Sequence, residues 1–410
     1  MTFLYQVGIF FYSAFIQFIS VFNEKARLFV QGRKNWQANL KSKIDTGAKY
    51  IWFHCASLGE FEQGRPVIEE LKNQFPEYKI VLTFFSPSGY EIRKNYPLAD
   101  VVTYLPIDTK SNATAFLNMV NPEKVFFVKY EFWYFYISEL KKRNIPLFII
   151  SAIFRENQQF FKETPVGKWY RKMLFKVEHF FIQNEKSGEL LKAVGISNFT
   201  VSGDTRFDRV ATIAKSAKEI PVVEKFKGDS LLIIAGSTWK PDEELLAEFI
   251  NQSGLKFIIA PHEVSEGNIN RIHQLLKKPA ISFSKVTESE IDRFQVLIID
   301  SVGLLSSLYR YGNLAYIGGG FGVGIHNILE AATFGLPVIF GPNYKKFKEA
   351  VDLTNDGGAI SISNFDELRQ ALINLINDEI KRNKGSEICS NYVAKNVGST
   401  QIIIKKVFNT

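Results

Sequence analysis

Short, continuous runs of apolar residues alternate with longer helical stretches along most of this chain. In the first half the runs are residues 50–55, 79–85, 101–105, 124–128, 146–151 and 180–183. Strands that are apolar throughout indicate a parallel sheet buried on both faces and covered by the intervening helices. A second series occupies residues 231–235, 256–260, 296–299 and 314–317, with a further run from residue 336. The pattern predicts an α/β fold of two doubly wound, Rossmann-like domains.

The length and composition agree with a folded protein of two domains. A chain of 410 residues is too long for one ordinary core, and two domains of roughly 200 residues each are expected. A net charge of +8 indicates an acidic partner, such as nucleic acid, anionic lipid or a phosphorylated substrate. The two cysteines, Cys55 and Cys389, exclude a disulfide framework and fit a reducing compartment. No Cys/His cluster has zinc spacing, so no structural metal is expected.

The N-terminus carries an uncharged apolar run at residues 3–22, followed by basic residues. Its length is near the ~20 residues that span a bilayer as a helix, and the basic flank would keep the rest of the chain in the cytoplasm. A helix lying in the membrane interface is the competing interpretation, and an amphipathic core helix is the plain structural one. We therefore divide the chain into a hydrophobic anchor with its basic flank (1–35), a first domain (36–205), a linker region (206–228) and a second domain with C-terminal helices (229–410).

In a parallel sheet, ligands bind beyond the carboxyl ends of the strands, so the residues there are the candidates for chemistry. The first strand is followed by Ser57-Leu-Gly-Glu60, in which Gly59 permits a tight turn. Glu60 in the first helical turn either complements the helix dipole or takes a proton from a substrate hydroxyl. Ser57 and Gly59 are candidates for contacts with an acceptor, and further candidates follow three other strands: Ser88, Glu131 and Arg155. As plain alternatives, Ser88 caps a helix and Glu131 pairs with a nearby lysine.

A basic and aromatic stretch occupies residues 162–176. It suits either an anionic membrane surface or a phosphorylated lipid, and a solvated helix face with a few core aromatics is an equal alternative.

In the second domain, four strand ends carry polar or glycine-rich turns. Gly236-Ser237-Thr238 follows one strand and Pro261-His262 the next, and a third ends in Asp300-Ser-Val-Gly303. The fourth runs into Gly318-Gly319-Gly320, and a helix carrying His326, Asn327 and Glu330 on its first turn is predicted after this loop. Glycines allow close approach of a ligand, and free N–H groups at a helix start favour an anion. Glycines that only make tight turns are the plain alternative.

Two such domains, with the nucleotide features in the second, describe the GT-B glycosyltransferase architecture, with a cleft between the domains. Several segments then match one family in the right order. They are the apolar N-terminus, Ser57-Leu-Gly-Glu60, Thr83-x-x-Ser-Pro-Ser-Gly89, Tyr104-Leu-Pro-x-Asp108, Glu131-Phe-Trp133, Gly236-Ser-Thr238 and the stretch Gly319-Gly320 to His326-Asn-x-x-Glu330. Together they resemble the 3-deoxy-D-manno-octulosonic acid (Kdo) transferases of lipopolysaccharide synthesis.

The resemblance implies a membrane-associated, inverting enzyme that moves Kdo from CMP-Kdo to a lipid A precursor, lipid IVA. It implies Glu60 as the catalytic base, and donor contacts from Gly319, Gly320, Asn327 and Glu330, with Ser237 and Thr238 near the donor. His262 and His326 join this predicted donor set. The implied location is the inner (cytoplasmic) membrane with the catalytic domains on the cytoplasmic side. The expected partners are the anionic lipid A precursor, the membrane surface and a nucleotide sugar, with no nucleic acid, metal or cofactor.

The chain departs from the family pattern at three places. His262 stands where the family usually has Arg, Leu304 where it has Glu, and Tyr130 where it has Thr. Two other readings therefore stay open. One is a GT-B enzyme using a different nucleotide sugar, either a UDP-sugar transferase or an epimerase. The other is a catalytically inactive GT-B membrane scaffold.

Overall fold

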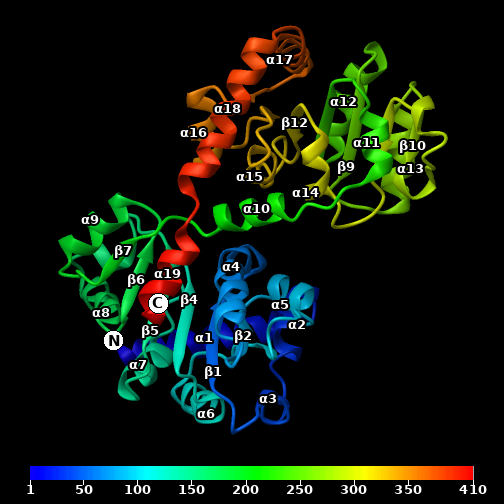
Figure 1. Ribbon diagram of the computed structural model, residues 1–410. Coiled ribbons are helices and arrows are strands. Elements are labelled where there is room, and N and C mark those ends of the chain that lie inside the picture. Colours follow the sequence, from blue (N-terminus) through cyan, green and yellow to red (C-terminus); the bar gives the residue numbers. More distant parts are fainter. Residues whose placement is uncertain (410) are drawn as a thin grey trace. The chain divides into compact units, whose positions relative to one another are not determined.

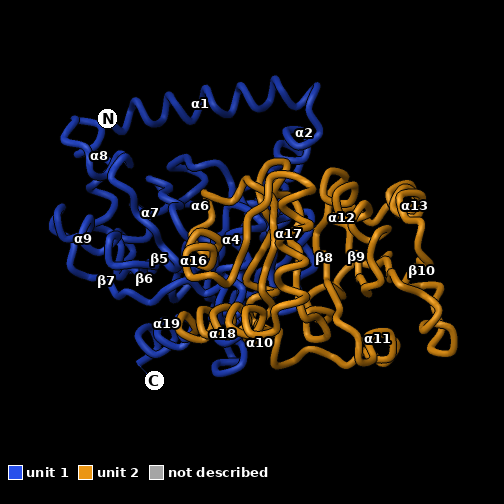
Figure 2. Tube along the Cα trace, turned by 90° about the horizontal axis from the view of Figure 1, so that it is seen from above, with its two compact units in different colours: residues 1–209, 398–410 blue, residues 210–397 orange. Residues whose placement is uncertain are grey.

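The computed structural model describes residues 1–409, which form two compact units. Unit 1 comprises residues 1–209 together with the C-terminal segment from residue 398, and unit 2 comprises residues 210–397 (Figure 2). The interval 206–228, predicted as a linker, contains two helices, α10 (Arg206–Lys215) and α11 (Pro221–Lys227). The N-terminal segment 1–35 belongs to unit 1.

Unit 1 is built on a seven-stranded parallel sheet of order β3-β2-β1-β4-β5-β6-β7 (Figure 1). The strands are β1 (Tyr50–Cys55), β2 (Lys79–Phe84), β3 (Val101–Tyr104), β4 (Lys124–Val128), β5 (Leu147–Ala152), β6 (His179–Ile182) and β7 (Phe199–Val201). The first six coincide with the predicted runs to within two residues at either end. The short strand β7 was not predicted, because its three residues are only half-buried and make no continuous apolar run.

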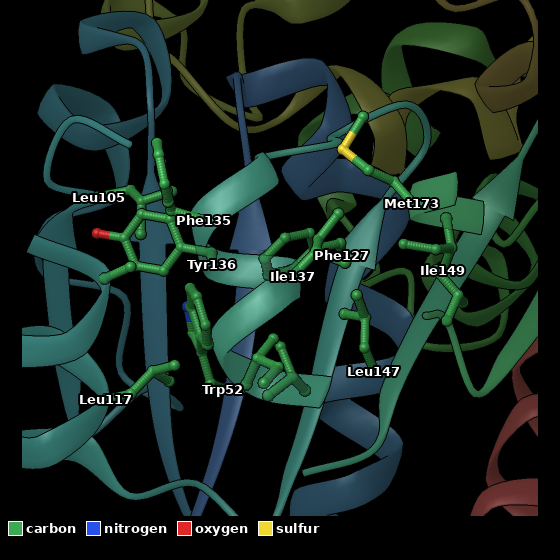
Figure 3. Close-up of a cluster of buried hydrophobic side chains, with 14 of the residues drawn as sticks. Trp52, Leu105, Leu117, Phe127, Phe135, Tyr136, Ile137, Leu147, Ile149 and Met173 are labelled. Atoms are coloured by element: carbon green, nitrogen blue, oxygen red, sulfur yellow. The ribbon is translucent and has the colours of Figure 1, made fainter. Parts of the chain in front are cut away.

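Alternate residues of these strands face two separate apolar layers. Trp52 of β1 points into a layer shared with α6 (Lys110–Val120), α7 (Tyr134–Lys142) and α8 (Pro165–Leu174), part of which Figure 3 shows. The neighbouring Phe53 points into the opposite layer, with α4 (Leu58–Gln74). Each large side chain buried in this way contributes about 1.5–3 kcal/mol. The doubly wound arrangement thus follows from strands that are apolar on both faces.

The C-terminal helix α19 (Ser399–Phe408) packs on unit 1 and corrects the predicted extent of the second domain. Ile403, Ile404 and Val407 are buried in the layer that contains Phe53. Asp208 holds the start of this helix, because its carboxylate accepts the backbone N–H groups of Gly398 at 2.6 Å and Thr400 at 2.7 Å. The second domain therefore ends before residue 398.

Unit 2 contains another seven-stranded parallel sheet, of order β10-β11-β9-β8-β12-β13-β14. Its strands are β8 (Leu232–Thr238), β9 (Lys256–Pro261), β10 (Ala280–Ser282), β11 (Val296–Ile298), β12 (Leu314–Ile317), β13 (Val338–Phe340) and β14 (Ala359–Ser361). One face packs against α12 (Lys240–Gln252), α13 (Glu266–Leu275) and α17 (Phe365–Asn377). The sequence analysis missed β10 and β14, which are three-residue strands ending in serine. The predicted α/β class with two doubly wound sheets is confirmed.

The remaining helices connect these elements. In unit 1 they are α2 (Glu24–Gln31), α3 (Trp36–Lys41), α5 (Pro87–Arg93) and α9 (Glu185–Ala193). In unit 2 they are α14 (Leu305–Leu308), α15 (Leu329–Ala332), α16 (Lys348–Asp356) and α18 (Glu379–Asn396). Cys55 and Cys389 are both buried and free.

The N-terminal helix α1 (Thr2–Ile19) lies against unit 1 with one side only. The Tyr5 hydroxyl donates to Asp108 Oδ2 at 2.6 Å, and the Tyr12 ring stacks on Phe85 with centroids 6.3 Å apart. The opposite side exposes a row of phenylalanines, each at least 60% accessible: Phe3, Phe10, Phe11, Phe15 and Phe18. By length and composition alone α1 is apolar enough to cross a membrane, and one such helix is weak evidence that it does.

Candidate active site

The order of the first sheet reverses between β1 and β4, and a ligand is expected beyond the carboxyl ends of the strands at such a reversal. The residues that follow β1 lead into α4 and Glu60, and those that follow β4 lead to Glu131. Two carboxylates that are 71 positions apart in the chain are thus placed at the same edge of the sheet.

Glu60 is buried in the first turn of α4. Its carboxylate accepts hydrogen bonds from the backbone N–H groups of Ala56 and Ser57, which hold it back over the start of the helix. Burial, together with the negative charge of Glu131, raises the pKa of Glu60 to about 7. The backbone N–H groups and Lys129 oppose this rise only in part. Glu60 therefore changes protonation near neutral pH, as a general base requires.

Glu131 belongs to a polar chain that runs into the core of the sheet. Its Oε2 accepts the indole N–H of Trp133 at 2.8 Å and lies 3.3 Å from His54 Nε2. His54 is completely buried, and its Nδ1 lies 2.9 Å from the Thr83 hydroxyl. These contacts fix the orientation of the Glu131 carboxylate beside Glu60.

The sequence analysis did not single out His54. The available signal was a histidine inside the otherwise apolar strand β1, immediately before its last residue. Lys129, which follows β4, also escaped notice. It adopts a left-handed backbone (φ 62°), a conformation that costs energy for a residue other than glycine and that is found often at functional sites.

The other predicted acceptor residues of unit 1 lie apart from this pair. Ser57 is the residue before α4, and a Cβ on Gly59 would meet its nearest atom, the Ser57 hydroxyl oxygen, at 4.0 Å. Ser88 is exposed at the start of α5, with its hydroxyl 3.1 Å from that of Ser86. Arg155 is exposed beyond β5, and its backbone N–H donates to Gln158. Over residues 1–409, no hydrogen bond or ion pair joins Ser88 or Arg155 to Glu60.

In the second sheet the order reverses between β8 and β12, and Asp242 ties these two strand ends together. One oxygen of its carboxylate accepts the backbone N–H groups of Trp239 and Gly319, both at 2.9 Å. Its other oxygen accepts the Tyr316 hydroxyl at 2.8 Å. Asp242, which the sequence analysis missed, thus anchors the glycine loop to the start of α12.

Three flat side chains stack beside this anchor. The rings of Trp239 and His262 lie 4.6 Å apart, those of His262 and His326 lie 4.4 Å apart, and both pairs are close to parallel. The Trp239 indole N–H donates to His326 Nε2 at 3.0 Å. Burial, together with the neighbouring His262, lowers the pKa of His326 to about 4, so His326 is neutral at pH 7 and able to accept this bond. Two predicted residues, His262 and His326, are brought together by a tryptophan that was not predicted.

The glycines of the loop meet protein backbone rather than open space. A Cβ on Gly320 would lie 2.6 Å from the backbone of Gly341, and Gly319 has φ 90° with a Cβ position 2.6 Å from the Gly324 carbonyl oxygen. Such distances exclude any side chain at either position. Both glycines are therefore required for the packing of the loop itself, which is the plain alternative named above.

The prediction that a helix begins at His326 is wrong. Helix α15 covers only Leu329–Ala332, and His326 and Asn327 precede it in irregular backbone. The Asn327 amide donates to Glu330 Oε1 at 3.1 Å, and its oxygen accepts the Leu329 N–H. Because α15 is a single turn, its first N–H groups supply no helix dipole for an anion.

Ser237 and Thr238 occupy unequal positions at the end of β8. Thr238 is buried, and its hydroxyl donates to Glu243 Oε1 at 3.0 Å, so that hydroxyl is engaged within the protein. Ser237 is half-buried and has a left-handed backbone (φ 55°) at an irregularity in the pairing with β9. Of the two, Ser237 is the better placed to meet a ligand.

Solved structures share this fold at low sequence identity. A UDP-GlcNAc 2-epimerase from Neisseria meningitidis, bound to UDP-GlcNAc, has a TM-score of 0.61 and is 18% identical, covering 88% of this chain and 100% of that chain. MurG of Acinetobacter baumannii has a TM-score of 0.55 and is 11% identical, covering 88% of this chain and 100% of that chain. At these identities the similarity concerns the GT-B fold alone.

Comparisons of sequence are more specific. Residues 27–209 match the family model described as 3-deoxy-D-manno-octulosonic-acid transferase (kdotransferase). The 3-deoxy-D-manno-octulosonic acid transferase of Aquifex aeolicus is 28% identical over 84% of this chain and 92% of its own length. The 3-deoxy-D-manno-octulosonic acid transferase of Haemophilus influenzae is 26% identical over 95% of this chain and 93% of its own length. With the family model over residues 27–209 and these relatives over most of its length, this chain is similar to the 3-deoxy-D-manno-octulosonic acid (Kdo) transferases.

Proposed function

We propose that this protein is an inverting glycosyltransferase of lipopolysaccharide biosynthesis that moves Kdo from CMP-Kdo to the lipid A precursor lipid IVA. The observation that carries the proposal is a buried carboxylate, Glu60, with a pKa of about 7 at the reversal point of the first sheet, in a chain similar to the Kdo transferases.

Glu60 is the general base of the proposed reaction. A hydroxyl of the acceptor sugar attacks the anomeric carbon of Kdo, and the bond from that carbon to the phosphate oxygen of CMP breaks with its electron pair leaving on CMP. The hydroxyl proton passes to Glu60, which later releases it to water. A base whose pKa lies near the working pH is both ionised and basic enough for this step. Glu131 supports it by raising the pKa of Glu60.

The donor is assigned to unit 2. The exposed edge of the Trp239–His262–His326 stack offers flat surfaces to a nucleobase, and Ser237, Asn327 and Glu330 offer polar groups to the ribose or phosphate. His262 stands where a family arginine is usual, so stacking on Trp239 is our explanation for how an imidazole serves at that position. No metal or cofactor takes part in the proposed mechanism.

The acceptor is assigned to unit 1, with α1 in the membrane interface on the cytoplasmic side of the inner membrane. One side of α1 is held by Tyr5 and Tyr12, while its phenylalanines face outward. A helix docked on its own domain with an exposed aromatic face matches an interfacial helix better than a span.

The test is incubation with CMP-Kdo and a tetra-acylated lipid A precursor, followed by mass spectrometry of the lipid. The expected product carries at least one added Kdo, and the Glu60→Gln variant should form none while binding CMP-Kdo as the wild type does. A parallel reaction with UDP-GlcNAc, read for sugar transfer and for epimerisation, addresses the other nucleotide-sugar enzymes. Turnover of UDP-GlcNAc without turnover of CMP-Kdo would refute the proposal.

The donor site has its own test. Trp239→Ala removes the stacking partner of His262 and should weaken CMP-Kdo binding at least tenfold in calorimetry. Trp36→Ala, a substitution in unit 1, is the matched control and should leave donor binding unchanged. Equal donor affinity in the Trp239→Ala variant and the wild type would contradict the donor assignment.

A further inference from the structure

A cavity of about 560 Å³ lies in unit 1 between α1 and the body of the unit. Its walls are almost entirely apolar and aromatic. The α1 side includes Tyr5, Gly8 and Tyr12, and the opposite side includes Phe85, Trp133 and Trp169. The volume falls within the range of small-molecule binding sites, which is roughly 300–1,000 Å³.

The cavity adjoins the carboxylate pair through a single side chain. The Trp133 ring forms part of the cavity wall and lies 4.5 Å from the Phe85 ring. The indole N–H of the same residue donates to Glu131 Oε2 at 2.8 Å. Trp133 therefore links the wall of the cavity directly to Glu131 of the carboxylate pair.

The chemistry of the cavity fits a hydrocarbon chain. Aromatic and aliphatic walls offer no set of polar partners for a sugar or nucleotide, whereas they gain free energy from buried methylene groups. Beyond the cavity, the outer side of α1 exposes phenylalanines such as Phe3 and Phe11 to the surroundings. A lipid whose chain lies in the cavity would thus have apolar surface on α1 as well as in the cavity itself.

Exposed cations flank one wall. Val166 and Trp169 of α8 line the cavity, and the same helix carries Lys168 and Lys172 on its exposed side. Within the basic and aromatic stretch noted in the sequence, Trp169 and Tyr170 line the cavity, whereas Lys168 and Lys172 are exposed. Positive charge on a helix that lines the cavity suits a lipid with anionic head groups.

We infer that this cavity holds one acyl chain of the acceptor lipid and thereby positions the acceptor sugar at Glu60 and Glu131. The inference rests on the proposed function for the identity of the acceptor. It assigns α1 a part in substrate selection, in addition to membrane attachment. Because each buried methylene changes affinity by about fourfold, the affinity should depend steeply on chain length.

Gly8 offers a direct way to fill the cavity. It lines the cavity, and a Cβ placed on it would meet no atom within 4 Å. Gly8→Phe therefore fills the space without a clash and replaces a poor helix former in the middle of α1. Val166→Phe fills the cavity from the opposite wall. Gln6→Phe adds the same ring to an exposed position of α1 outside the cavity and is the matched control.

The first experiment measures chain binding without any transfer reaction. Dodecyl maltoside with a brominated chain, used below its micelle concentration, should quench tryptophan fluorescence of the wild type, and Trp169→Phe should reduce the quenching. Gly8→Phe and Val166→Phe should each weaken binding at least tenfold, while Gln6→Phe should bind as the wild type does. Equal binding by the wild type and both filled variants would overturn the inference, whatever the enzyme's substrates prove to be.

The second experiment connects the cavity with the acceptor. In the filled variants the KM for the tetra-acylated acceptor should rise at least tenfold, with the KM for CMP-Kdo unchanged. An unchanged acceptor KM, together with lost binding of the brominated chain, would show that the cavity holds a bulk lipid instead and would refute the acceptor subsite. Absence of all Kdo transfer in the wild type would refute the proposed function and leave the first experiment to decide on the cavity.

Discussion

Replacing Glu60 by glutamine should stabilise unit 1 above neutral pH while it abolishes transfer. Burial and Glu131 raise the pKa of Glu60 from an ordinary value of 4.5 to about 7. Between these two pH values the folded protein keeps a proton that the unfolded chain releases, so the free energy of unfolding falls as the pH rises through this window. At 1.36 kcal/mol per pH unit, the full cost of ionising Glu60 in place is about 3 kcal/mol.

Glutamine removes this cost because it stays neutral and its side-chain oxygen can still accept the Ala56 N–H. Below pH 4.5 the variant and the wild type should be equally stable. Above pH 7 the variant should be more stable by about 3 kcal/mol, which for a unit of this size corresponds to roughly 6–12 °C in Tm.

The assay is differential scanning calorimetry of both proteins at pH 4.5 and pH 8.5, following the transition of unit 1. Glu77→Gln, at an exposed carboxylate beyond α4, is the control for the removal of one negative charge. The reasoning would be refuted by a Tm difference between Glu60→Gln and wild type that is the same at both pH values, or by a less stable variant at pH 8.5.

Three further predictions follow from the same geometry. Glu131→Gln removes a negative charge that raises the pKa of Glu60, so the acid limb of the pH profile of kcat/KM should move to lower pH; a limb that stays in place would contradict the coupling. Turnover should be unaffected by EDTA, and loss in EDTA with recovery in Mg²⁺ would contradict the metal-free mechanism. Gly320→Ala should lower the stability of unit 2 by about 1–3 kcal/mol in thermal unfolding, since its Cβ would collide with backbone. Gly322→Ala should leave the stability of unit 2 unchanged, because its Cβ would meet its nearest atom at 3.6 Å. Equal Tm values for the two variants would count against the packing argument.

The course of the chain through each sheet was largely readable from the sequence. Apolar runs that are uninterrupted over five or six residues report burial on both faces, and such burial is a local property of the run. The strands β7, β10 and β14 were not predicted, because three residues that are mostly half-buried carry too little of this signal.

The partners of the candidate residues were not readable in the same way. Nothing local in the sequence reports that His54 lies beside Glu131, that Trp239 stacks on His262, or that Asp242 receives the Gly319 N–H. Each of these contacts joins elements that are distant in the chain. The single-turn helix α15 shows the converse, because a helix pattern from His326 onward was overridden by the packing of the glycine loop.

What the amino-acid sequence by itself determined is the set of buried strands and the polar residues that follow them. Because parallel strands all point the same way, this set already placed Glu60 and Glu131 at one edge of the first sheet. Only the tertiary structure decided which strands are neighbours, and hence that these two carboxylates interact and shift the pKa of Glu60. It also decided that α19 returns to unit 1 and that α1 covers an apolar cavity, because long-range packing selects among arrangements that local patterns leave equally possible.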